Sequence, residues 1–363
     1  MCGYLYWISR SGKEKAFMKK VIVVCCLLLA LCGCQSAKNE GKSEDYANMG
    51  FPGISEDGIY HLVKTDFANE VYFYDFKTDK DVPLCSKVNC NHQNEDCDAY
   101  RLTFYKDKDQ TLHLPPIYYQ NKIYYLYENL QKGKTTLCSS NVDGTDLKKI
   151  ADIAKMAVVD NATFFDQKVW YTENAFDVDD KGNIISTSNH FKLMCLDLNN
   201  HKTEIIKESD DEMLLGRGVY DHQYYFMDVN SVDGKSVNEL VKYHEDNQTF
   251  ESIYQCESGN SFLINKYYYD YDKEAGKIFR MDVSDQSKSN VMDYQPEKGY
   301  EVFSVQTDDQ GIMTVVLKKD NQVVGESYID LLSEKVISGT GRVIYLKDGA
   351  YYCLNDKGLI YKE

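Results

Sequence analysis

The sequence is short of proline, basic residues and long apolar runs. Proline, which cannot donate to a β-ladder, occurs 5 times in 363 residues. This scarcity, together with 30 tyrosines and many short β-branched or aromatic runs, favours strands. Lysine and arginine number 41, against 57 aspartate and glutamate residues. Because an acidic surface repels phosphate backbones, we expect no nucleic-acid partner.

Catalytic sequence motifs are also lacking. The histidines show no H-E-x-x-H or triad arrangement, and there is no Gly-rich phosphate loop. We therefore assign no catalytic and no cofactor-binding residue and expect no enzymatic activity.

The N-terminal region has the layout of a secretory signal. Met18 and two lysines precede the apolar run Val21–Leu31, which is too short for a membrane span of roughly 20 residues. Residues 1–17 fit no part of such a signal, so we take Met18 as the natural start and residues 1–33 as the signal peptide.

The signal ends in Leu31-Cys32-Gly33-Cys34, which resembles the lipobox of bacterial lipoproteins. Cys32 departs from the usual Ala, Ser or Thr, and an ordinary cleaved signal with a chance cysteine is the alternative. The resemblance implies that Cys34 carries a diacylglycerol and anchors the protein to the outer face of a membrane. Two acyl chains hold a protein far better than one. Residues 34–54 are then the lipidated cysteine and a flexible polar tether.

A repeated phrase organises residues 55–363. A short apolar run, a polar turn and a Tyr-rich run recur as Ile117–Tyr127, Thr163–Tyr171, Gly218–Phe226 and Ser261–Tyr269, with weaker copies at Phe303–Val316 and Arg342–Leu354. Equivalent positions are about 45 residues apart, as four short antiparallel strands require. Those positions are Tyr124, Trp170, Tyr225, Tyr268, Ile312 and Tyr351.

An earlier unit, Gly58–Phe76, brings the count to seven. We predict an all-β fold, a β-propeller of seven four-stranded antiparallel blades, with six or eight blades as alternatives because partial end units often combine across the closure. A β-sandwich pair or a β-solenoid is less consistent with a repeated four-strand phrase.

The Asn141–Leu147 turn and the Lys-Ile-Tyr-Tyr hairpin at Lys122–Tyr125 resemble the TolB-like and YWTD-like β-propeller lipoproteins of Gram-positive anaerobes. The resemblance covers roughly residues 55–363. It implies the architecture and a surface location, and it supplies no catalytic residues.

The most unusual local sequence lies in a Cys-rich insertion at about residues 85–114. Cys85, Cys90, His92 and Cys97 follow the pattern C-x4-C-x-H-x4-C, which has the number and types of ligand that tetrahedral zinc requires. Outside the cytoplasm, two of these cysteines could instead form a disulfide, and reduced, unliganded thiols are a third reading. The lipoproteins just named often carry such a patch, so the resemblance implies a family feature.

Four further cysteines, Cys138, Cys195, Cys256 and Cys353, stand beside apolar residues in predicted strands. A buried free cysteine behaves as a small hydrophobe, so we predict that all four are core residues.

Together these features predict a monomeric, membrane-anchored surface propeller that binds a protein or glycan ligand. An extracellular lyase or glycosidase acting on polysaccharide is one alternative, since a fold does not decide function. An envelope assembly or structural factor is another.

Overall fold

The computed structural model describes residues 46–363 apart from 66–68, 93, 106–107, 181–183, 233–234, 257–259, 321 and 338–340. The predicted signal peptide, Cys34 and the first part of the tether lie outside the described residues. Among the residues described, no helix has the length and apolar character needed to cross a membrane. The helix α2, Asp98–Arg101, has four residues.

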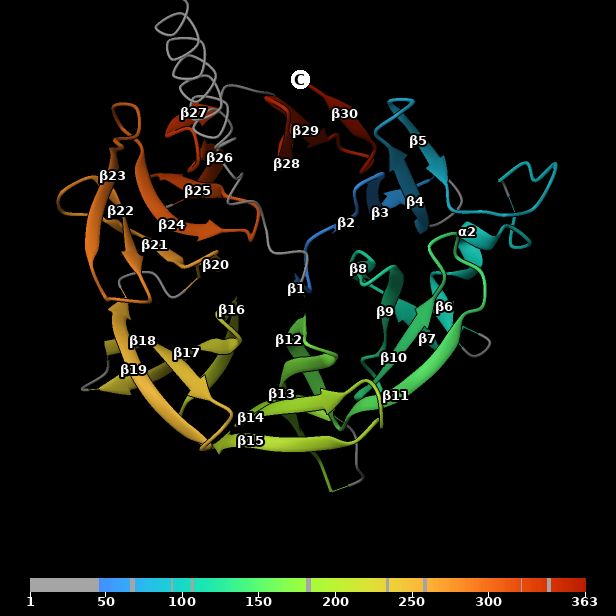
Figure 1. Cartoon of the computed structure of the whole chain (residues 1–363), viewed down its shortest axis with the longest axis horizontal. Coiled ribbons are helices and arrows are strands. Elements are labelled where there is room, and N and C mark those ends of the chain that lie inside the picture. Colours follow the sequence, from blue (N-terminus) through green and yellow to red (C-terminus); the bar gives the residue numbers. More distant parts are fainter. Residues whose placement is uncertain are drawn as a thin grey trace, which may run out of the picture. The chain divides into compact units, whose positions relative to one another are not determined.

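Seven antiparallel sheets stand around a common centre (Figure 1). Within most sheets, strands that follow one another in the chain are hydrogen-bonded neighbours. This arrangement confirms the predicted β-propeller with seven blades, and we number the blades in chain order.

Blades 1 to 3 contain the strands of the first half of the chain. Blade 1 comprises β2 (Gly53–Ile54), β3 (Gly58–Lys64), β4 (Asn69–Asp75) and β5 (Lys80–Pro83). Blade 2 comprises β6 (Phe104–Tyr105), β7 (Gln110–Leu112), β8 (Ile117–Tyr119), β9 (Lys122–Asn129), β10 (Lys134–Ser140) and β11 (Lys148–Lys155). Blade 3 comprises β1 (Tyr46–Asn48), β12 (Ala157–Phe165), β13 (Lys168–Val178), β14 (Ile184–Asp197) and β15 (Thr203–Ser209).

Blades 4 to 7 follow with fewer additions. Blade 4 comprises β16 (Met213–Tyr220), β17 (Gln223–Val232), β18 (Lys235–His244) and β19 (Thr249–Cys256). Blade 5 comprises β20 (Leu263–Ile264), β21 (Tyr267–Asp272), β22 (Lys277–Asp282) and β23 (Lys288–Asp293). Blade 6 comprises β24 (Glu301–Thr307), β25 (Ile312–Lys319), β26 (Gln322–Asp330) and β27 (Lys335–Ile337), and blade 7 comprises β28 (Arg342–Lys347), β29 (Ala350–Leu354) and β30 (Ile360–Lys362).

The first hairpin of several blades turns on two residues that both have positive φ. Two positive φ angles in succession make a type I′ turn, whose twist matches that of the flanking strands. Asn and Asp tolerate this left-handed region better than most residues, which explains why a polar pair separates the two runs of the repeated phrase. The pairs are Gln120–Asn121, Asp166–Gln167, Asp221–His222 and Asp348–Gly349, with φ between 47° and 78°.

Tyrosines of the repeated phrase fill space between neighbouring blades. The hydroxyl of Tyr125 lies 3.0 Å from Ser140 Oγ, and that of Tyr127 donates to the Leu102 carbonyl at 2.8 Å. The rings therefore add apolar area while most of their cost in buried polar groups is met. The fully buried tyrosines are Tyr119, Tyr125, Tyr127, Tyr171, Tyr225, Tyr268 and Tyr269.

The start of the described chain lies at the centre of the ring, where β1 pairs with β12 (Figure 1). Asn48 Nδ2 donates to Asp309 Oδ2 of blade 6 at 2.9 Å, and Thr163 Oγ1 of blade 3 donates to Asn48 Oδ1 at 2.7 Å. The Tyr46 hydroxyl reaches the Leu263 carbonyl of blade 5. The expectation that residues 34–54 are all tether is thus wrong for 46–54, because β1 and β2 are built into the ring.

The ring closes without a shared strand. Within the described residues, blade 7 has three strands and none of them pairs with blade 1, so the end units do not combine into one blade, which was the ground for the six- and eight-bladed alternatives. Instead Asp81 of β5 accepts two hydrogen bonds: His61 Nε2 donates to Oδ1, and the Ile360 backbone N–H donates to Oδ2, each at 2.6 Å. Around them lies a cluster of apolar side chains from both blades, Ile59, Tyr74, Ile344, Tyr352 and Ile360.

We predict that Asp81→Asn weakens this closure. The substitution keeps the shape of the side chain but removes the charge that strengthens both buried hydrogen bonds, which should lower the free energy of unfolding by about 2 kcal/mol. Urea unfolding followed by tryptophan fluorescence measures the change. The matched control is Asp348→Asn, the same substitution at an exposed turn of blade 7. Equal stability of the two variants would show that the closure does not depend on the Asp81 charge.

Candidate functional site

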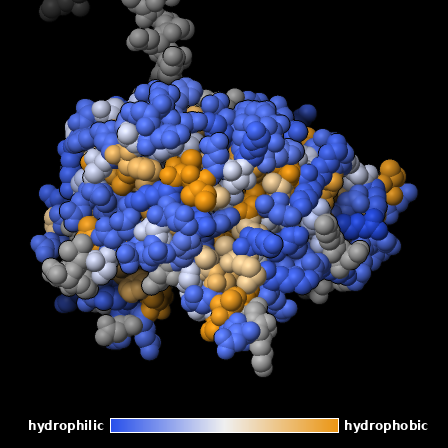
Figure 2. Space-filling view, turned by 90° about the horizontal axis from the view of Figure 1, so that it is seen from below, coloured by the Kyte–Doolittle hydropathy of each residue, from blue (hydrophilic) through white to orange (hydrophobic). Residues whose placement is uncertain are grey.

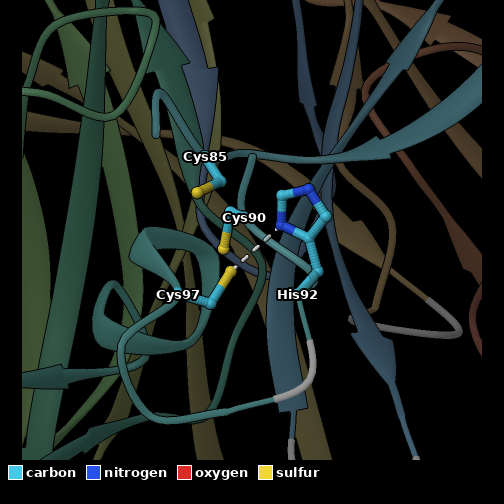
Figure 3. Close-up of side chains that lie close together, drawn as sticks. All are labelled: Cys85, Cys90, His92 and Cys97. Carbon is cyan, nitrogen blue, oxygen red and sulfur yellow. Dashed lines mark hydrogen bonds between the residues drawn. The ribbon is translucent and has the colours of Figure 1, made fainter. Parts of the chain in front are cut away.

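The Cys-rich insertion connects the outer strand of blade 1 to blade 2. It begins directly after β5 with Cys85, passes through Cys90 and His92, and reaches Cys97 at the N-cap of α2. Each of the four residues offers one ligand atom, and these atoms all lie within 4.8 Å of one another (Figure 3). The structure therefore brings together every residue of the predicted C-x4-C-x-H-x4-C pattern.

The backbone of the insertion bends sharply to achieve this convergence. Asn89 has φ of 62° and His92 has φ of 54°, both in the left-handed region that non-glycine residues adopt rarely. The bend at His92 turns the imidazole toward the thiols, so that Nδ1 lies 3.3 Å from Cys97 Sγ.

The thiols differ in their surroundings. Cys97 is fully buried, and Cys85, Cys90 and His92 are half-buried. Burial, with a smaller contribution from the neighbouring Cys85, raises the pKa of Cys97 to about 12. Burial also opposes ionisation of Cys85, but backbone hydrogen bonds at Lys87 and Asp98 and the side chains of Cys90 and Cys97 outweigh it and hold the pKa of Cys85 below its ordinary value. Cys85 therefore ionises more readily than Cys97.

The donor set suits a soft or borderline metal ion. Thiolate sulfur and imidazole nitrogen are the ligands that tetrahedral zinc takes in proteins, at roughly 2.3 Å and 2.0–2.1 Å. A tetrahedron of that size separates neighbouring sulfurs by about 3.8 Å, which lies within the 4.8 Å spread of the four donors. The seven cysteines that the structure describes are free thiols.

A pocket of about 360 Å³ adjoins the cluster, and we call it the blade 1–2 pocket. A Cβ added at Gly144 would come within 2.8 Å of Leu102 Cδ1, so the blade 2 turn packs closely against the segment after α2. Ser86, which follows Cys85, and Asp98, which follows Cys97, both line this pocket. The lining is Ser86, Asp98, Arg101, Leu102, Gly144, Thr145, Asp146 and Leu147.

A second hollow of about 460 Å³ lies between blades 5 and 6, and we call it the blade 5–6 groove. Its described lining combines aromatic and aliphatic side chains with three carboxylates and no basic residue. The lining is Asp293, Tyr294, Gln295, Pro296, Glu297, Tyr300, Leu317, Val324, Gly325, Glu326, Ser327 and Val336.

The wall of this groove formed by β26 has an open edge. The inner edge pairs with β25 along the strand, whereas β27 pairs only with Tyr328–Asp330. Gln322–Ser327 consequently has no strand on its outer side among the described residues. A register shift places Val323 and Val324 opposite Lys318, a bulge of the kind that redirects side chains at sheet edges.

Sequence reasoning missed this groove. Val323, Val324, Val336 and Phe303 are all exposed in blade 6, and the only sequence signal was the pair Val323-Val324, which breaks the alternation expected of a half-buried strand. Figure 2, which views the molecule from the side of blade 3, shows a mostly hydrophilic face with several apolar patches.

The remaining predicted sites have simple outcomes. Cys34 lies outside the described residues. Cys138, Cys195, Cys256 and Cys353 lie in β10, β14, β19 and β29 and are buried, which confirms their prediction as core residues.

Comparison with known proteins shows the fold. The sequence matches no protein-family model and no curated protein. A solved oligogalacturonate lyase in complex with manganese is similar at a TM-score of 0.51 and 11% identity, covering 88% of this chain and 91% of its own. The acylaminoacyl peptidase of Pyrococcus horikoshii is similar at 0.50 and 11% identity, covering 87% and 51% respectively.

TolB from Acinetobacter baumannii is similar at a TM-score of 0.36 and 11% identity, covering 87% of this chain and 80% of its own. Similarity this weak supports no closer relationship than a shared fold. None of these proteins transfers an activity, a metal or a partner to this chain.

We predict that thiol reactivity divides the cysteines into two groups. Burial raises the pKa of Cys195 and Cys256 to about 12 and that of Cys353 to about 11, so their reactive thiolates are scarce at neutral pH. Iodoacetamide at pH 7.5, after treatment with a chelator, should therefore label Cys85 and Cys90 but label these three only once the protein is denatured. Mass spectrometry of the labelled peptides measures this, and equal labelling of both groups in the native protein would contradict the buried positions.

Proposed function

We propose that this protein is a β-propeller that a lipid anchors to the outer face of a membrane. We further propose that it binds an extended protein segment in the blade 5–6 groove and performs no catalysis. The lipobox-like Leu31–Cys34 motif supports the anchoring. The observation that carries the binding proposal is that no described strand pairs with the outer edge of β26 at Gln322–Ser327, which borders an apolar, aromatic groove.

An open strand edge offers unpaired backbone N–H and C=O groups along its length. An extended segment can satisfy these groups by lying alongside the edge, while neighbouring pockets select its side chains. The edge at Gln322–Ser327 has such a pocket in Tyr294, Pro296 and Tyr300. The groove volume of about 460 Å³ is in the range of binding sites.

The charge of the groove indicates the kind of segment. Asp293, Glu297 and Glu326 line it, in a chain whose formal net charge is −16. Carboxylates attract cationic partners and repel anionic ones. We therefore propose that the bound segment combines basic residues with aromatic or aliphatic ones.

The centre of the ring supports a role other than catalysis. Asn48 and Asp309, which meet there, are buried and hydrogen-bonded to each other, and β1 lies against both β8 and β16. A short extra strand and a hydrogen-bonded side-chain pair thus take up part of the centre of the ring.

The anchoring is tested by Cys34→Ser, which removes the thiol that would carry the lipid. We expect the wild-type protein expressed in a bacterial host to take up an alkyne-labelled fatty acid and to sediment with membranes. The Cys34→Ser variant should lose at least nine-tenths of the label, and Cys32→Ser should keep it. Full labelling of the Cys34 variant would contradict lipidation at this residue.

The groove is tested with a displayed library of random dodecapeptides selected on the immobilised protein. We expect enriched peptides to carry basic and aromatic residues, and Val324→Lys to weaken their binding at least tenfold because the added ammonium repels basic side chains. The control is Val82→Lys in β5, because Val82 is similarly exposed, at 41% against 49% for Val324.

Two results would overturn the proposal. Peptide affinity unchanged by Val324→Lys would remove the groove as the binding site. Depolymerisation of a polysaccharide panel by the purified protein, or glycan-array binding without peptide binding, would favour an enzyme or a glycan-binding protein instead.

A further inference from the structure

We propose that Cys85, Cys90, His92 and Cys97 bind one zinc ion, and that this ion holds the insertion between blades 1 and 2 in its folded form. The four donors come from three separate segments: the residues after β5, the bend at 89–92 and the start of α2. This site is independent of the blade 5–6 groove.

The surroundings of the sulfurs are those of metal-bound thiolates. Backbone hydrogen bonds at Lys87 and Asp98 reach Cys85, and those at Ala99 and Tyr100 reach Cys97. Hydrogen bonds of this kind orient ligands and stabilise their negative charge. A carboxylate lies beside Cys85, with Asp98 Oδ2 3.8 Å from its Sγ, and Lys87 pairs with Asp98 Oδ1 at 3.2 Å and so balances that negative charge beside the cluster.

A disulfide explains less of the geometry. It would use two sulfurs and would leave the third cysteine and His92 without a role. The left-handed backbone at His92 costs energy that some interaction must offset. Metal coordination by the imidazole supplies that interaction, because it rewards the rotation that turns the ring toward all three thiols.

The insertion also needs an additional constraint to fold. Its own core consists of Cys97, Ala99 and Tyr100, with Cys85, Cys90 and Phe104 packed against them. A four-residue helix such as α2 is unstable alone, and a small apolar cluster of this size contributes little. A structural zinc site, by contrast, contributes folding free energy directly.

Zinc would thereby shape the blade 1–2 pocket. Ser86 follows one ligand and Asp98 follows another, and both line that pocket. Leu102, which follows α2, accepts a hydrogen bond from Tyr127 of blade 2 and packs against the turn at Gly144. Removing the ion should therefore loosen the insertion and this pocket while the blades stay folded.

The first experiment measures metal content on the full chain, purified in detergent without added metal and without affinity tags that bind metal. Plasma mass spectrometry should find about one zinc per chain in the wild type and less than a tenth of that in Cys90→Ser or His92→Asn. Both substitutions affect half-buried residues, so they test the site without opening the core. Cys195→Ala, which removes a thiol outside the cluster, should keep the zinc.

The second experiment tests the role of the ion. After chelation, limited trypsin digestion should cut at Lys87 or Arg101 at least tenfold faster, and restoring zinc should reverse this, while circular dichroism of the strands stays unchanged. Cobalt in place of zinc should give the absorption of a tetrahedral thiolate site.

The proposal fails if the wild type as purified carries no zinc and either intact mass shows a disulfide among the cluster cysteines or all three thiols titrate freely. Stoichiometric iron or copper would overturn the assignment to zinc. Zinc that stays bound in Cys90→Ser and His92→Asn would remove these residues as ligands.

Discussion

The contact between the first and last blades is the constraint on which the rest of this propeller depends. No described strand is shared between these two blades, so the ring is closed by individual contacts, of which Asp81 makes two by joining β3, β5 and β30 through its carboxylate oxygens. A backbone hydrogen bond from Lys64 to Lys357 runs beside it. Because each blade packs on its neighbours, a defect at this seam would spread to the packing of the whole ring.

The repeat made most of the fold predictable from sequence. The Tyr-rich runs and polar turns mark local structure, since a strand and a type I′ turn are each specified by a few adjacent residues. The strand β1 could not be foreseen in the same way. Tyr46-Ala47-Asn48 lies in a polar stretch, and its burial depends on partners such as Leu263 and Asp309 that are more than 200 residues away.

The cysteine–histidine cluster and the blade 5–6 groove differ in how far the sequence predicts them. The spacing of Cys85, Cys90, His92 and Cys97 identified a candidate site because ligands close in sequence can converge after one or two turns. Whether the donors formed pairs or a single cluster depended on backbone bends at Asn89 and His92, which the residue types do not specify. The blade 5–6 groove could not be predicted from the sequence. Its walls come from two blades, and it depends on how short the outer strand of blade 6 is.

The position of β1 has a mechanical consequence. Because β1 lies near the centre of the ring, a force applied to residues before Tyr46 acts first on the three-residue ladder with β12. It also acts on the hydrogen bond between Asn48 and Asp309. Load applied there acts on blades 3, 5 and 6 together instead of peeling one blade from the rim. If Cys34 anchors the chain, force from the membrane reaches the propeller through β1 near the centre of the ring. The outer strands of the blades then carry none of that force directly.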